Sequence, residues 1–400
     1  MPARLVVLSC ILFFLIAVYV VVNYPGPKEQ PYIRASDNVN IAPKQHETLS
    51  YVEPEEQPCI RRIRDVTIAP NQPETIYSRV YDSPINGHVI YKSLDAGISW
   101  RTIISSVHFS RIGLLVDPEN SNILYFRESY SSTGIRGTKS TDGGRSWNTI
   151  QAGPRIINPH NSAIIYATGP GGIRKSTDGG AGWTDLKGDW NSCGAIALAP
   201  RDPRILYAYC RREPERGIFK SINAGADWNL VLPARDIENL AVDPDDSEIV
   251  YAGTRFWGVF RSIDGGKQWN TARYGLPKSR YDSAWGTGDA GTDSWGSSPS
   301  GLPMNEAIRH LVIDPIHSSI YVGTSSGVFK SIDRAVSWRG INNGLPPRYP
   351  GVSALAINPK NPNIIYAGTW ARGIFKSIDG GVHWVPASTG ITCGPSFSYL

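Results

Sequence analysis

The chain has 400 residues, a formal net charge of +5 and a hydrophobic content of 41%. This length suits one large domain or two ordinary ones. The mild positive charge allows an acidic partner without requiring one. The sequence contains no basic tract and no nucleic-acid signature, so we expect no nucleic-acid partner.

The first 24 residues are predicted to anchor the chain in a membrane. Residues 5–22 read LVVLSCILFFLIAVYVVV, without a charge, which is near the length that crosses a bilayer. No small-residue cleavage site follows, so a retained anchor is favoured over a cleaved signal. Arg4 favours a cytoplasmic N-terminus, whereas Lys28 and Arg34 weaken that argument. The rest of the chain is then expected on the periplasmic or extracellular (lumenal) side.

Residues 25–58 are rich in Pro and polar residues. This composition is typical of an extended tether. Alternatively, part of the segment lends a strand to the structure that follows.

The remainder of the chain is built on a repeated box, S-x-D-x-G-x-x-W. Its period of roughly 36–47 residues is that of a propeller blade, except for one longer interval before the sixth copy. Two copies are degraded, because Asn223 replaces the Asp and Ala335 replaces the Gly. The copies begin at Ser93, Ser140, Ser176, Ser221, Ser262, Ser331 and Ser377.

Each box is preceded by two apolar, β-branched runs that flank a Pro, in most repeats within an Asp-Pro or Asn-Pro turn, as in AVDPDDSEIVY. A third run such as GIFKS leads into the box, and the box Trp is expected to open a fourth strand. One such sheet cannot cover both of its own faces, whereas seven stacked radially cover each other. We therefore predict an all-β, seven-bladed β-propeller over residues 59–393, with an insertion at about 274–305 and a tail at 394–400.

The boxes are interpreted as structural links between the third and fourth strands. The Asp suits backbone N–H groups of its own loop, and the Trp can bury apolar area between blades, worth about 2–3 kcal/mol. A metal or sugar site in each box is the disfavoured alternative, because one carboxylate is a poor ligand set. A basic residue before each box Ser is interpreted as a charge on an exposed strand face. The structural box residues are Asp95, Trp100, Asp142, Trp147, Asp178, Trp183, Trp228, Asp264, Trp269, Asp333, Trp338, Asp379 and Trp384.

These repeats resemble the Asp-box, or BNR-repeat, propellers, which include sialidases, xyloglucanases, the sortilin ectodomain and photosystem II assembly and stability factors. The resemblance covers roughly residues 60–390 and implies the fold more strongly than any activity. It implies boxes at the blade periphery, away from the active face. The sialidase Arg-Ile-Pro element is matched only by RRIRD at 61–65, which lacks the Pro. Xyloglucanases pair two propellers around a cleft, whereas this chain predicts one.

Two cysteine pairs are predicted. Cys193 and Cys210 flank a hairpin, and Cys59 and Cys393 lie at the two ends of the propeller, which must meet. Buried free thiols are the alternative, and disulfides require an oxidising compartment. We expect no metal and no cofactor, because the seven histidines are scattered without ligand spacing.

Recognition is assigned to the face opposite the boxes, where the loops between second and third strands vary. Arginines and aromatic residues recur there, a composition enriched at interface hot spots. The alternative is a set of solvated arginines paired with local glutamates. The candidate binding residues, including two tryptophans of the insertion, are Arg127, Arg136, Arg211, Arg212, Arg216, Arg255, Trp257, Trp285, Trp295, Trp370 and Arg372.

From these features we expect a non-enzymatic, membrane-anchored scaffold, accessory subunit or assembly factor that binds a membrane-protein complex, as the resemblance to assembly factors implies. The alternative is a glycoside hydrolase or glycan-binding propeller of the sialidase or xyloglucanase type. For that alternative, Asp289 and Asp293 in the insertion are the candidate catalytic carboxylates.

Overall fold

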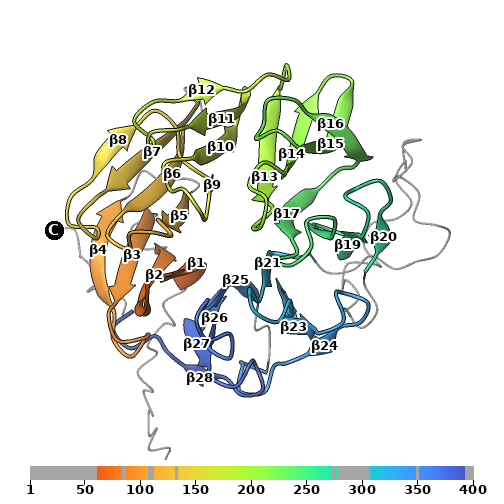
Figure 1. The fold of residues 1–400 in the computed structure, drawn as a ribbon. Coiled ribbons are helices and arrows are strands. Elements are labelled where there is room, and N and C mark those ends of the chain that lie inside the picture. Colours follow the sequence, from red (N-terminus) through yellow and green to blue (C-terminus); the bar gives the residue numbers. More distant parts are fainter. Residues whose placement is uncertain are drawn as a thin grey trace, which may run out of the picture. The chain divides into compact units, whose positions relative to one another are not determined.

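The computed structural model describes residues 61–82, 87–106, 112–130, 134–272, 276, 307–347 and 351–391. They form seven four-stranded antiparallel sheets that follow one another in chain order around a ring (Figure 1). The predicted all-β, seven-bladed propeller is therefore confirmed. No helix in this described part is long and apolar enough to cross a membrane. The predicted anchor, the tether, Cys59, Cys393 and the tail at 394–400 lie outside it.

Every blade is made of four consecutive strands, with the first innermost and the fourth outermost (Figure 1). The innermost strands are β1 (Arg61–Ala69), β5 (Ile112–Val116), β9 (Ile156–Ile157), β13 (Ser192–Leu198), β17 (Ile237–Val242), β21 (His310–Ile313) and β25 (Val352–Ile357). The second strands are β2 (Gln72–Asp82), β6 (Leu124–Tyr130), β10 (Ile165–Gly169), β14 (Leu206–Arg212), β18 (Val250–Thr254), β22 (Ile320–Thr324) and β26 (Ile365–Thr369).

The outer half of each blade contains the box, which joins the third strand to the fourth. The third strands are β3 (Gly87–Ser93), β7 (Gly134–Ser140), β11 (Gly172–Ser176), β15 (Glu215–Ser221), β19 (Val259–Ser262), β23 (Gly327–Ser331) and β27 (Ile374–Ser377). The fourth strands, each beginning one residue after the box Trp, are β4 (Arg101–Ser106), β8 (Asn148–Ile150), β12 (Thr184–Asp185), β16 (Asn229–Pro233), β20 (Asn270–Thr271), β24 (Arg339–Gly340) and β28 (Val385–Pro386).

In five of the seven blades, an Asp or Asn side chain holds the turn between the first two strands. In blade 2, Asp117 Oδ1 accepts hydrogen bonds from the backbone N–H groups of Glu119 and Asn120, at 2.8 and 3.0 Å. The backbone N–H of Gly143 in the box donates to the carbonyl of Asn122 in the same turn. Turn and box therefore lie together at one end of the blade, and the loop between the second and third strands lies at the other end.

Each box Asp is committed to its own loop. In blade 1, Asp95 accepts from the backbone N–H of Ser99 at 2.9 Å and from the hydroxyls of Ser99 and Ser93 at 2.5 and 2.7 Å. The Ser99 hydroxyl is the main cause that lowers the pKa of Asp95 to about 2. In blade 4, Asn223 takes the place of the Asp and still accepts from Ser221 at 3.0 Å. The carboxylates therefore shape the loop and have little capacity left for a ligand.

The box tryptophans divide into two groups. The indole N–H groups of Trp100, Trp338 and Trp384 donate to carbonyls of the preceding blade, Ala387, Ala272 and Ile341. The other four donate within their own box, at 3.0–3.2 Å. Of these four, Trp228 is buried, and the other three are half-buried. These four are Trp147, Trp183, Trp228 and Trp269.

Adjacent blades are joined by a clamp that the sequence did not predict. Its acceptor is the carbonyl of the fourth box residue, and its donors are a Tyr and a basic residue of the preceding blade. Between blades 2 and 3, Gly179 O accepts from Tyr125 Oη at 3.1 Å and from Lys139 Nζ at 2.8 Å. The lysine also lies 5.3 Å from the Tyr125 ring centroid, a cation–π arrangement.

The expectation that these basic residues decorate an exposed strand face is wrong. Lys92, for example, is only 8% exposed, and its ammonium donates to Gly143 O of the next blade. The misinterpretation arose because the acceptor is contributed by another blade. Every one of the seven blade junctions contains at least one such bond, to Ala96, Gly143, Gly179, Ala224, Gly265, Arg334 or Gly380.

The same clamp closes the ring. Ala96 O in blade 1 accepts from Tyr366 Oη at 2.9 Å and from Lys376 Nζ at 3.0 Å in blade 7. Lys360 Nζ adds a bond of 2.9 Å to Asn71 O. Blade 7 takes four strands from its own stretch of chain. The N-terminal segment, the alternative source of a strand, lies outside the described residues.

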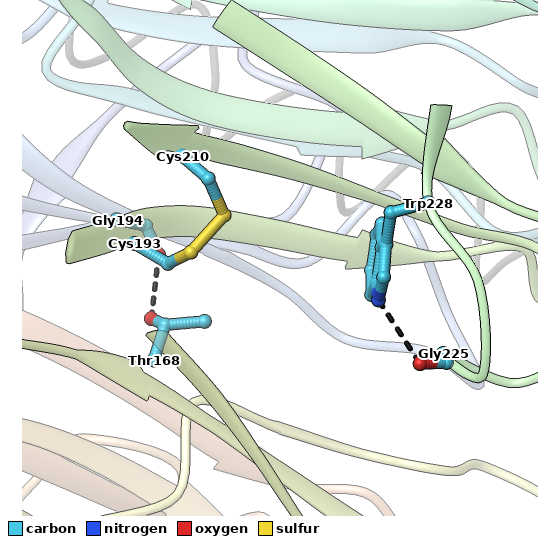
Figure 2. The surroundings of a disulfide bond; sticks show 6 residues. All are labelled: Thr168, Cys193, Gly194, Cys210, Gly225 and Trp228. Atoms are coloured by element: carbon cyan, nitrogen blue, oxygen red, sulfur yellow. Dashed lines mark hydrogen bonds between the residues drawn. A yellow bond between two sulfur atoms is a disulfide. The ribbon is translucent and has the colours of Figure 1, made fainter. Parts of the chain in front are cut away.

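A disulfide links Cys193 and Cys210, as predicted. The two residues are direct partners across β13 and β14, with Cα atoms 4.1 Å apart. Beside it, the Thr168 hydroxyl of blade 3 donates to Gly194 O of blade 4 at 2.6 Å (Figure 2). The disulfide therefore reinforces an inner hairpin at the contact between two blades.

We expect Lys139→Met to lower the free energy of unfolding by about 1.5–3 kcal/mol, because it removes a charged hydrogen bond to the next blade. Urea unfolding followed by tryptophan fluorescence measures this loss. Lys187→Met, which changes an exposed lysine of blade 3, is the control and should have little effect. Equal stability of the two variants would contradict a structural role for the clamp.

The low pKa of Asp95 predicts acid sensitivity. A carboxylate whose pKa is lower in the folded state stabilises the fold above its unfolded pKa, and this contribution is lost as pH falls from about 4 to about 2. Asp95→Asn should therefore flatten the pH dependence of the unfolding free energy in that window. An unchanged slope in Asp95→Asn would contradict the prediction.

Candidate functional site

Three candidate arginines lie on the β14–β15 hairpin of blade 4 and contact other residues of the same hairpin: Arg211, Arg212 and Arg216. Arg211 pairs with Glu213, and Arg212 pairs with Glu215 at 2.7 Å. Arg216 donates to Tyr209 Oη at 2.6 Å. The alternative interpretation, local pairing of loop arginines, therefore describes this hairpin.

Two further arginines of this face, Arg255 and Arg372, are exposed, and neither guanidinium forms an ion pair with a described residue. The adjacent tryptophans are half-buried. Trp257 packs against the core between blades 4 and 5, whereas Trp370 carries the Arg309 guanidinium 4.2 Å from its ring centroid. Trp370 therefore couples the loop of blade 7 to the inner strand of blade 6.

The remaining candidate binding and catalytic residues do not lie in the described loops between second and third strands. Arg127 and Arg136 lie on strands β6 and β7, not in the loop that joins them. The tryptophans and carboxylates proposed in the insertion, Trp285, Trp295, Asp289 and Asp293, lie outside the described residues.

A cluster of ionisable groups occupies the inner ends of several blades at the same face. It is centred on Asp65 of β1, whose Oδ2 accepts from Arg79 Nε of β2 at 2.8 Å. The Arg79 side chain is 10% exposed, so this ion pair is largely withdrawn from water. We call the following residues the axial cluster: Arg64, Asp65, Arg79, Arg127, Arg155, Glu238, Arg309 and His310.

Charges from different blades act on one another within the axial cluster. Burial, and then the positive charge of Arg127, lower the pKa of Arg155 to about 9, whereas Asp65 and Glu238 oppose the shift. These residues belong to blades 1, 2, 3 and 5. Arg155 stays protonated at neutral pH, so it is a partly exposed cation at the start of the first strand of blade 3.

His310 faces the same environment from blade 6. Burial lowers the pKa of its imidazole, and the negative charge of Asp65 counteracts that effect. Its Nδ1 is buried and has no hydrogen-bond partner among the described residues. Glu238 and Arg309 are exposed at the starts of β17 and β21, so these two members of the cluster are open to solvent.

The loop end of blade 1 adds an aromatic and imidazole group next to the axial cluster. The rings of Tyr81 and His88 are 5.4 Å apart, and the Arg64 guanidinium lies 5.9 Å from the Tyr81 centroid. Burial, followed by the charges of Arg79 and Arg64, lowers the pKa of His88 to about 4. His88 is therefore neutral at physiological pH. Asp82 is buried at the end of β2 beside it.

Sequence reasoning missed the axial cluster because its members are far apart along the chain. One signal was present. Arg155 occupies a position in the first strand at which the other six repeats carry an apolar residue. Aligning the repeats on their Pro would have identified this exception.

No protein-family profile matches the chain. A xyloglucanase of Hypocrea jecorina (strain QM6a) is 29% identical over 229 residues, which cover 46% of this chain and 27% of that relative. A xyloglucanase of Paenibacillus sp is 28% identical over 235 residues, which cover 48% of this chain and 21% of that relative. The chain thus spans about a quarter or less of the length of these curated relatives.

Solved structures agree on the fold. The GH74 xyloglucanase from Xanthomonas campestris superposes with a TM-score of 0.62 at 14% identity, covering 82% of this chain and 55% of that chain. YCF48 bound to D1 peptide gives 0.52 at 12% identity, covering 84% and 95%. The chain is therefore a seven-bladed β-propeller whose structural neighbours include GH74 xyloglucanases and YCF48.

These comparisons overturn the expectation that the protein is not an enzyme. The relatives that match in sequence are named xyloglucanase, and so are solved structures with the same fold. Xyloglucanases were expected to pair two propellers, whereas the described residues form one.

We expect Arg79→Met to lower the free energy of unfolding by about 3 kcal/mol, because it leaves the Asp65 carboxylate without its ion-pair partner in a largely buried setting. The matched control is Arg174→Met, which breaks an exposed pair with Asp185 and should cost less than about 1 kcal/mol. Urea unfolding at pH 7 measures both, and equal losses would contradict the special environment of Asp65.

Proposed function

We propose that the protein is a carbohydrate-active enzyme of the xyloglucanase type, a glycoside hydrolase that acts on xyloglucan or a related β-glucan. The observation that carries the proposal is the sequence match to two xyloglucanases, at 28–29% identity over 229 and 235 residues. A shared fold alone would not support an activity, but a match in sequence of this length adds information beyond the fold.

The face bearing the axial cluster supplies suitable groups for binding a sugar chain. Trp370, together with Arg309, and Tyr81, together with Arg64, present aromatic rings next to guanidinium groups. Aromatic rings offer an apolar surface for the C–H faces of sugars, and the adjacent guanidinium groups can donate hydrogen bonds to hydroxyl groups. We assign substrate binding to these residues.

Glycoside hydrolysis requires two carboxyl groups, one acting as acid and the other as base or nucleophile. Asp65 accepts a hydrogen bond from Arg79 at 2.8 Å, a contact that fixes the position of its carboxylate, and we assign it the role of base or nucleophile. Glu238 is exposed on another blade and acts on the same Arg155. We assign the acid role to Glu238.

The test is hydrolysis of xyloglucan by the purified full-length protein, followed by reducing-end assay and product chromatography. We expect Asp65→Asn and Glu238→Gln each to lower kcat by about 100-fold or more, and Trp370→Ala to raise KM about tenfold. Asp185→Asn, on an exposed outer strand, is the control and should retain full activity. Melting temperatures identify any variant that has lost its fold.

Absence of both binding and cleavage across xyloglucan, mixed-linkage glucan and cellulose oligosaccharides would refute the hydrolase proposal. Cleavage that persists in both carboxylate variants would refute the assignment of Asp65 and Glu238 while leaving the activity in place.

The same face supports a second role, which would add to hydrolysis: binding of a protein partner in a membrane complex. The supporting observation is that Arg255 and Arg372 are exposed without an ion-pair partner among the described residues, which fits interface hot spots. Arg255→Glu with Arg372→Glu should release a partner that co-purifies from membranes. Arg204→Glu, on an exposed turn of the opposite face, should not.

A further inference from the structure

Arg155 breaks the repeat at a position that is otherwise apolar. Its backbone N–H donates to Tyr166 O at 2.8 Å, which places it at the start of the first strand of blade 3. In the other blades the equivalent residue faces the position that follows the conserved Tyr and packs into the core between blades. Those six residues are Val66, Leu114, Ile196, Leu240, Leu311 and Leu355.

The guanidinium of Arg155 has no hydrogen-bond acceptor and no ion-pair partner among the described residues, although it retains partial exposure. Asp65 and Glu238 act on it only at longer range. Withdrawing an unpaired charge from water is costly, so the fold keeps a cation where an apolar residue would be more stable. Such a residue is explained by an anionic group that arrives from outside.

In blade 2, two glycines make room for a second guanidinium, that of Arg127, close to the segment that leads to Arg155. A Cβ on Gly153 would lie 2.4 Å from Arg127 Cγ, and a Cβ on Gly137 would lie 2.7 Å from Gly153 Cα. The two glycines therefore allow the Arg127 side chain to run against the crossover that leads to Arg155.

We infer that Arg155, with Arg127 beside it, binds the carboxylate of an acidic sugar, so that the substrate class is a uronate-bearing β-glucan. Two features favour a carboxylate over a phosphate or sulfate. The planar guanidinium fork matches a carboxylate. In addition, Asp65 and Glu238 already contribute negative charge near Arg155, which favours an anion with a single charge.

The sugar part of this inference rests on the proposed function, and the carboxylate part rests on Arg155 alone. The two are separable with a matched pair of ligands: a xyloglucan oligosaccharide whose side-chain galactose carries a C6 carboxylate, and the same oligosaccharide with the C6 alcohol. The ligands differ in one functional group, so any difference in affinity reports recognition of the carboxylate.

Isothermal titration calorimetry on the full-length protein measures both affinities. We expect the acidic ligand to bind at least tenfold more tightly than the neutral one. Arg155→Leu, which installs the residue of the other blades, should abolish this difference without lowering the melting temperature of the ligand-free protein. Arg174→Leu, an exposed arginine of the same blade, is the control and should keep the difference. Arg155→Lys retains the charge but loses the fork, so it should keep only part of the gain.

The outcomes separate the two claims. Equal affinity for both ligands overturns the inference while leaving the hydrolase proposal standing. A preference for the acidic ligand without any polysaccharide cleavage supports the inference and refutes the hydrolase. A preference that survives in Arg155→Leu overturns the assignment to Arg155. A peptide whose terminal carboxylate binds in place of the acidic sugar overturns the assignment to a glycan.

Discussion

One hydrogen-bonded junction, repeated around the ring, underlies the whole structure. A carbonyl in each box accepts from a buried Tyr hydroxyl, a basic side chain or both in the preceding blade, as Gly179 does from Tyr125 and Lys139. Because the same contact joins blade 7 to blade 1 at Ala96, closure needs no separate device among the described residues. The box thus has two tasks: its Asp shapes the loop, and its backbone carbonyl holds the neighbouring blade.

This division of labour determines where chemistry can take place. The box carboxylates accept hydrogen bonds from their own loops, as Asp95 does from Ser93 and Ser99. The box end of each blade is therefore structural. At the opposite end, the inner strands begin near the axis and bring side chains from several blades together. Asp65, Arg155 and Glu238 come from three different blades. Such a site is assembled by the ring and cannot exist in any single blade.

The sequence matches to xyloglucanases and the composition of the axial cluster are both compatible with a glycan-binding site, but they differ in the kind of glycan that they suggest. The matches indicate a hydrolase, whereas the site is richer in arginine than recognition of a neutral glucan requires. Arg155 is the clearest case, since it replaces an apolar residue and lacks an ion-pair partner among the described residues. A carboxylate on the sugar would reconcile these two observations, because it would offset the cost of the partly buried cation.

Local sequence by itself determined the blades. The Pro turns, the boxes and the apolar runs are short-range patterns, and from them followed the four-stranded unit, the number of blades and the pairing of Cys193 with Cys210, which depends only on hairpin register. Tertiary structure alone decided which charges meet. The basic residue before each box was misjudged because its acceptor lies in the next blade. Side-chain geometry also decided that Arg211 and Arg212 pair with local glutamates. The axial cluster was missed because ring closure brings together residues, such as Asp65 and His310, that lie far apart in the chain.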